Sequence, residues 1–195
     1  VAVVVAGEDG RRRLRVMQWG LIPPWGRDPR EGGRLFNARG ETVTTRPAFR
    51  EAFAHRRCLV VADGFYEWRR EGRLRQPWYF AAADDRLLAL AGVWSRWERP
   101  GGEAVASCSV LTTAANAAMR PIHDRMPVIV PPEARARWLE TPPADAAALL
   151  PLLAPPPDDA LRRHAVSPLV NRVTSEGPEL IAPCAVPPSA QLGLF

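Results

Sequence analysis

Proline and glycine interrupt this chain so often that few segments are long enough for an extended helix. The sequence has 21 Pro and 14 Gly in 195 residues, and several of them cluster, at 23–26, 100–102 and 155–157. Proline breaks helices and is confined to the edges of sheets, while glycine favours turns. The apolar and alternating runs between these breaks are mostly as long as a strand, so the sequence favours a mostly β protein.

The predicted fold class is α+β, with many short strands and a few scattered helices. Strands are expected at 2–5, 12–19, 58–62, 66–68, 78–81, 87–94, 105–112, 127–130, 161–166 and 179–182. Helical segments are expected at 45–55, 114–119, 133–139 and 144–153, with Thr45 as the N-cap of the first. The length suits one domain. We expect that domain to span residues 1–185, followed by a flexible tail over 186–195.

The charge balance favours a polyanionic partner, because the net charge is +5 and the isoelectric point is about 10.0. The sequence contains no lysine, so all 26 basic residues are arginine. Arginine forks match phosphate oxygens and stack on bases. A genome biased toward arginine codons also explains the missing lysine, but it does not explain the positive balance. No lysine is present to form a Schiff base with an aldehyde.

The cysteines predict neither a disulfide framework nor a metal site. Cys58, Cys108 and Cys184 are odd in number and lack the spacing of metal ligands. The first two lie in apolar runs and are expected to be small buried residues. No cofactor is predicted. No apolar run reaches 18 residues, so we expect no membrane span and a cytoplasmic location.

Three polar islands lie inside apolar surroundings. The islands are Phe36-Asn37-Ala38-Arg39, Asp63-Gly64-Phe65-Tyr66-Glu67-Trp68 and Ile122-His123-Asp124-Arg125-Met126-Pro127. The first contains the amide of Asn37, the second the carboxylate of Glu67 and the third the imidazole of His123. Each follows or adjoins a strand-like run. Since protein cores rarely hold such groups without partners, their convergence predicts a site.

Each of these three residues also has an ordinary structural interpretation. The aromatic neighbours of Glu67 predict lost hydration and a raised pKa, as in a general acid or base, but the residue could also be a strand carboxylate paired with arginine. His123 has an acidic and a basic neighbour, yet a lone histidine is more often a structural hydrogen-bonding group. Asn37 is equally compatible with a common turn position.

Arginine and tryptophan together favour single-stranded nucleic acid, which binds basic grooves that carry stacking platforms. The sequence has seven Trp, and most of them are expected in the core. Trp25 is the best candidate for base contact because it lies in a Pro/Gly loop. Candidates beside it are Trp68, Arg39 and Arg125, together with Trp19 and an exposed-looking Trp97.

The three islands, in this order and spacing, resemble the SRAP family (SOS response-associated peptidase) from about residue 12 to about residue 183. Members of this family cross-link abasic sites in single-stranded DNA. The resemblance implies that Glu67 acts as acid or base, and that His123 helps the sugar open to its aldehyde. It also implies that Asn37 orients an N-terminal amine and that Arg39 contacts phosphate.

The resemblance also implies a nucleophile that this sequence does not contain. Family members carry a cysteine directly after the initiator Met, and its amine and thiol close a thiazolidine ring on the sugar aldehyde. This sequence begins at Val1, inside the family pattern. We expect an N-terminal fragment or a start site placed too late. The chain beginning at Val1 is therefore predicted not to cross-link DNA, since no other cysteine joins a thiol to a free amine.

The C-terminal five residues resemble the peptide by which bacterial repair proteins bind the replicative sliding clamp. Gln191 would lie at the edge of the clamp pocket, and Leu192, Leu194 and Phe195 would supply apolar contacts. A plain apolar C-terminus is the alternative.

Two other functions stay open from sequence: a non-catalytic single-stranded DNA-binding module, and a cysteine-type peptidase that acts on other proteins. The peptidase alternative also needs an N-terminal Cys and most economically describes removal of the protein's own leader. We expect a monomer associated with the nucleoid.

Overall fold

The computed structural model describes residues 1–7, 9–72, 74–98, 101–102 and 104–185. Two β-sheets and a few short helices make up this part of the chain, which confirms the predicted α+β, mostly β class. The clamp-peptide residues Gln191, Leu192, Leu194 and Phe195, and the predicted tail over 186–195, lie outside the described residues. No helix within the described ranges is long and apolar enough to cross a membrane.

The larger sheet has eight strands, and most neighbours are antiparallel. Its strands run in the order β10 (Arg125–Pro127), β9 (Ala104–Ala114), β8 (Leu88–Glu98), β5 (Arg57–Ala62), β1 (Ala2–Ala6) and β2 (Arg12–Val16), while β3 (Gln18–Trp19) and β4 (Asn37–Arg39) pair with β9 in parallel. β9 therefore brings together β3 and β4 from the first fifth of the chain, β8 from the third and β10 from the fourth. This pairing brings together the first and third polar islands, while the second lies on β6 of the other sheet.

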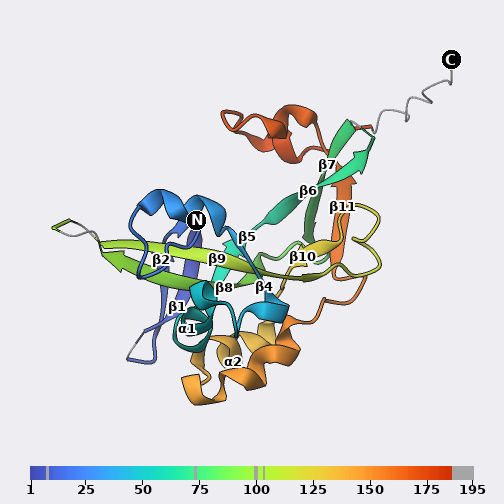
Figure 1. Ribbon diagram of the computed structural model, residues 1–195. Helices are drawn as coiled ribbons and strands as arrows, with labels where there is room; N and C mark the ends of the chain where they lie inside the picture. Colours follow the sequence, from blue (N-terminus) through green and yellow to red (C-terminus); the bar gives the residue numbers. More distant parts are fainter. Residues whose placement is uncertain (8, 73, 99–100, 103, 186–195) are drawn as a thin grey trace.

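The large sheet has two apolar faces, because alternate residues of a strand point to opposite sides. On one face, Leu59, Ala91 and Leu111 pack against the helices α1 (Pro47–His55), α2 (Arg135–Glu140) and the 3₁₀ helix η4 (Pro143–Leu153). On the other face, Val60 and Val110 belong to a second core cluster. Helices α1 and α2 lie on the first face (Figure 1), and the cavity described below lies on the second.

Helix α1 forms where the apolar spacing predicts it, since Phe49, Ala52 and Phe53 recur at i, i+3 and i+4 and are all buried. Its start differs from the prediction. The N-cap is Arg46, which makes no side-chain cap bond, and Pro47 occupies the first turn. Thr45 instead donates its hydroxyl to the Thr42 carbonyl at 3.1 Å. The predicted Thr45 cap is wrong because the helix begins at Pro47, which places Arg46 and not Thr45 at the cap position.

Arg57 is a buried charge that joins both helices to the sheet. Its guanidinium donates to the carbonyls of Phe53 and Ala54 at the end of α1, at 2.7 and 2.6 Å. It also donates to Trp138 in α2 at 2.7 Å and to Thr141 just beyond that helix. The last carbonyls of a helix lack partners within it. One arginine therefore satisfies the ends of two helices.

The smaller sheet contains β6 (Gly64–Glu71), β7 (Leu74–Ala82) and β11 (Leu161–Ala165), with β7 in the centre. It projects away from the larger sheet (Figure 1). The chain passes directly from β5 to β6 through Asp63 and Gly64. A Cβ at Gly64 would lie 2.3 Å from the Phe80 carbonyl oxygen, so only glycine permits this close approach.

The connections within the described residues contain five further 3₁₀ helices: η1 (Pro29–Arg34), η2 (Gly40–Thr42), η3 (Pro132–Ala134), η5 (Pro168–Asn171) and η6 (Pro178–Ile181). The helix predicted over 144–153 is present as η4, which is a 3₁₀ helix and contains Pro151. One sequence prediction is wrong here. The predicted strand over 179–182 is η6, which begins at Pro178 after Gly177, whose φ is +132°.

Residues 125–130 fill a gap where β8 and β9 separate. β9 pairs with β8 only up to Val110, and beyond it pairs with β10. The residues that follow β10 also bond to β8, since the Ala91 N–H donates to the Val128 carbonyl at 2.8 Å. These bonds to β8 and β9 hold Arg125, and His123 just before it, at the edge of the second face of the sheet.

Candidate active site

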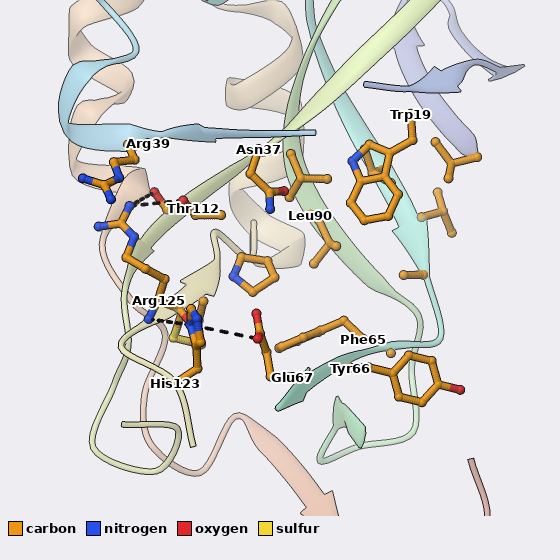
Figure 2. A pocket seen from close by; sticks show the side chains of 18 of the residues that line it. Trp19, Asn37, Arg39, Phe65, Tyr66, Glu67, Leu90, Thr112, His123 and Arg125 are labelled. Atoms are coloured by element: carbon orange, nitrogen blue, oxygen red, sulfur yellow. Dashed lines mark hydrogen bonds and ion pairs between the residues drawn. The ribbon is translucent and has the colours of Figure 1, made fainter. Parts of the chain in front are cut away.

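A cavity of about 580 Å³ lies between the two sheets and gathers all three polar islands. Its apolar floor is the free face of the large sheet, with Val60, Leu90 and Val110. Segments 64–68 of β6 form one wall, β3 and β4 contribute to another, and residues 123–127 also line it. Figure 2 shows Glu67 pointing into this space between His123 and Asn37, while Tyr66 points away.

Glu67 and His123 form the central pair. A Glu67 carboxylate oxygen lies 4.0 Å from Nδ1 of His123, and the Glu67 side chain is 24% exposed. Partial burial raises the pKa of the Glu67 carboxyl above its ordinary value; nearby His123 opposes this rise and Asp124 adds to it. The raised pKa agrees with the direction predicted from its aromatic neighbours. Such a carboxyl is suited to accept and release a proton near neutral pH.

The His123 ring is oriented by the backbone of Arg125. Both the N–H and the carbonyl oxygen of Arg125 lie 3.0 Å from Nδ1. In the neutral tautomer with its proton on Nε2, Nδ1 accepts the Arg125 N–H. When Nδ1 carries a proton, in the other tautomer or in the charged ring, it donates to the Arg125 carbonyl. His123 therefore has a backbone partner in both states, as a proton-transferring residue needs.

Asn37 and Arg39 reach the cavity from β4. Both are exposed, while Ala38 between them is fully buried in the core. The parallel register sets Asn37 beside Val110 and Arg39 beside Thr112 of β9. Alternation along a short strand thus presents the amide and the guanidinium to the same space. Arg46, which the sequence analysis did not single out, also lines the cavity.

Arg125 lies in the cavity wall but is already paired. Its guanidinium makes a bidentate ion pair with Glu41, at 2.5 and 2.9 Å, and donates to the Thr112 carbonyl at 2.7 Å. This pair lowers the pKa of Glu41. Glu41 was missed by sequence reasoning, although a carboxylate two residues after Arg39 in a predicted basic groove was a usable signal.

The structure separates the tryptophans into three groups. Trp68 lines the cavity and donates its Nε1–H to Asn171 at 2.7 Å, and Trp19 also lines it, 46% exposed. Trp25 is 58% exposed but does not line this cavity. Trp97 is 4% exposed and donates to the Gly26 carbonyl, so its predicted exposure is wrong. An alternating strand, β8, turns Trp97 inward.

The chain's amino end reaches the same cavity. Val1 lines it, and the Val1 amine donates to the Met17 carbonyl at 2.8 Å. Cys58 and Cys108 are buried as predicted, and burial raises the pKa of Cys108 to about 11. A thiol with this pKa is almost entirely protonated at neutral pH, so it is a poor nucleophile. Among the described residues, no group of three His, Cys, Asp or Glu is placed to hold a metal ion.

Several known proteins are similar to this chain in sequence or in fold. A Bacillus subtilis (strain 168) protein named abasic site processing protein YoqW is 37% identical over 180 residues, which is 92% of this chain and 80% of that protein. A Xenopus tropicalis protein named abasic site processing protein HMCES is 35% identical, across 90% of this chain and 58% of its own length. A crystal structure of a protein from Bacteroides thetaiotaomicron superposes with a TM-score of 0.81 at 27% identity, covering 94% of this chain and 81% of that one.

The family described as SOS response associated peptidase (SRAP) matches residues 1–173. This match spans the cavity and every polar island that suggested the resemblance. The chain belongs to the SRAP family.

Proposed function

We propose that this protein binds single-stranded DNA at abasic sites and that the Glu67–His123 cavity is where such a site is processed. The observation that carries the proposal is a carboxyl with a raised pKa, 4.0 Å from an oriented imidazole, in a cavity that also receives Asn37 and Arg39. The names of the relatives, abasic site processing proteins, support the same substrate.

The proposed chemistry is formation of a thiazolidine through an N-terminal cysteine that this chain does not contain. The α-amine attacks C1′ of the ring-opened sugar, water leaves, and an imine forms. The thiol then adds to the imine carbon and its proton moves to nitrogen, which closes the ring. An α-amine with a pKa near 8 is partly neutral at pH 7, so it needs no lysine.

Each polar residue has a proposed role in these steps. His123 assists opening of the sugar, and Glu67 transfers protons as water leaves. Asn37 orients the amine through its side-chain carbonyl. Arg39 contacts a phosphate directly. Arg125 attracts a phosphate more weakly, because Glu41 partly neutralises its positive charge. Self-processing, in which the leader before the cysteine is removed, would use the same cavity.

Base contact is proposed for Trp68 in the cavity wall and for Trp25 on the neighbouring loop. Trp25 does not line the cavity, so it would contact a base that lies beyond the abasic nucleotide. We propose that the protein acts as a monomer at the nucleoid.

The test is a denaturing gel of protein incubated with a single strand that carries one abasic site. A form that carries an N-terminal Cys is expected to give a heat-resistant shifted band. The chain beginning at Val1, and a form with an N-terminal Ser, are expected to give none. A band of equal intensity from the Val1 chain would overturn the proposed nucleophile. A non-covalent complex without any band from the Cys form would leave the DNA-binding module as the function.

The C-terminal peptide is proposed to bind the bacterial sliding clamp weakly, with a dissociation constant on the order of micromolar, because a flexible peptide loses entropy on binding. Calorimetry of a peptide ending in Gln191 to Phe195 against purified clamp tests this. A control peptide with Leu194→Ala and Phe195→Ala is expected to release no heat. Equal heat from the two peptides would exclude the clamp as a partner.

A further inference from the structure

The face of the small sheet that carries Glu67 continues beyond the cavity as a cluster of two arginines and a tryptophan. In the register of β6 and β7, Glu67 lies opposite Trp78, and Arg69 lies opposite Gln76. In the register of β11 and β7, Ala165 lies opposite Trp78, and Arg163 lies two positions before Ala165 on β11. Since residues directly opposite share a face and alternate residues return to it, Glu67, Arg69, Trp78 and Arg163 all lie on one face.

The two guanidinium groups are held against the indole. The central carbon of the Arg69 guanidinium and that of the Arg163 guanidinium each lie 5.9 Å from the Trp78 ring centre. The two charges are therefore no more than about 12 Å apart, within one stretch of a nucleic-acid backbone. A cation over an indole face loses conformational freedom without losing its charge. The arrangement presents two positive groups in fixed positions beside the site.

Packing alone does not account for a tryptophan at this position. The Nε1–H of Trp78 is buried and has no hydrogen-bond partner among the described residues. A phenyl ring would fill much of the same space without an unpaired donor, but it offers cations a weaker π face. Arg163 is exposed and forms no ion pair within the described part of the chain. Its charge is available to a ligand.

We propose that Arg69, Trp78 and Arg163 form a second phosphate-binding site, for the DNA backbone on one side of the abasic nucleotide. Arg39 and Arg46 reach the cavity from β4 and the start of α1, whereas this cluster follows Glu67 outward along the small sheet. The single strand enters between the two arginine groups, so that its abasic sugar lies at Glu67. This inference rests on the proposed binding of single-stranded DNA.

The experiment measures affinity by fluorescence anisotropy at several salt concentrations, without any covalent step. The probes are three single strands that carry the stable tetrahydrofuran analogue of an abasic site: one with long flanks on both sides, one shortened on the 5′ side and one shortened on the 3′ side. The variant is Arg69→Gln with Arg163→Gln. The matched control is Arg50→Gln with Arg86→Gln, which removes the same charge from two exposed arginines that do not line the cavity.

On the strand with both flanks, the slope of log affinity against log salt is expected to be smaller for the variant than for the control, by about 0.7 for each phosphate contact that is lost. On one of the two shortened strands, variant and control are expected to have the same slope. Equal slopes for variant and control on all three strands would overturn the second site, and so would a uniform loss on all three. If the unmodified protein binds none of the strands, the proposed function itself fails.

Discussion

At the residue scale, the role proposed for Glu67 and the stability of the fold oppose each other. The aromatic sequence around it was enough to predict a raised pKa, and the structure supplies the cause, since partial burial disfavours the charged form. The folded state therefore holds the Glu67 proton to higher pH than the unfolded state does. Between the unfolded and the folded pKa the folded state binds more protons, so this residue makes folding less stable as pH rises.

Glu67→Gln is consequently expected to raise the melting temperature at about pH 7 and to have less effect at about pH 4, where Glu67 is protonated in much of the population. Thermal unfolding followed by circular dichroism at both pH values measures the difference. Asp84→Asn, at an exposed turn carboxylate, is the control. A variant that melts below the parent at neutral pH would show that the Glu67 charge stabilises the fold.

At the scale of elements, most strands were predictable, and so were the positions of α1, α2 and η4. Apolar runs within β5, β8 and β9 identified these strands, because each strand contributes residues to the apolar clusters on both faces of the sheet. The register that brings β4 beside β9 was not readable, since a three-residue strand carries too little pattern to select a partner. The 3₁₀ helices η4 and η6 each begin at a proline and contain apolar residues. Apolar content alone therefore did not distinguish η4 from an α-helix or η6 from a strand.

The joint between helices and sheet depends on Arg57, which no local pattern identified. Arg57→Met keeps the apolar stem but leaves the carbonyls at the ends of α1 and α2 without their donor. We expect a loss of about 1–3 kcal/mol in the free energy of unfolding. Urea denaturation of this variant beside Arg50→Met, an exposed arginine on α1, measures it; the control is expected to change by less than about 0.5 kcal/mol. Equal midpoints for the two variants would refute this role.

At the scale of the whole molecule, the two sheets enclose a cavity whose floor is apolar and whose rim is basic. The net charge and the arginine content predicted a polyanionic partner, but only the folded chain shows Arg39 exposed and Arg125 paired with Glu41. The ion pair could not be deduced from sequence because 84 residues separate its members. The net charge counts Arg39 and Arg125 equally. In the structure Arg39 is more available to a phosphate, because Arg125 is paired with Glu41.

Binding of single-stranded DNA is therefore expected to weaken steeply with salt, and Arg39→Ala is expected to reduce the slope of log affinity against log salt by about one. Arg125→Ala is expected to reduce it less, because Glu41 already neutralises that charge. Anisotropy titrations across salt concentrations compare the two variants. An equal or larger reduction from Arg125→Ala would mean that DNA displaces Glu41.

The central claim is that Glu67 transfers protons while an abasic site in single-stranded DNA is bound in the cavity. The most direct measurement is the single-turnover rate of cross-linking by a form with an N-terminal Cys, compared with the same form carrying Glu67→Gln. The rate is expected to fall by roughly 10²–10⁴-fold, with His123→Ala acting in the same direction, while affinity for the tetrahydrofuran strand stays nearly unchanged. Equal cross-linking rates for the parent and Glu67→Gln would contradict the account.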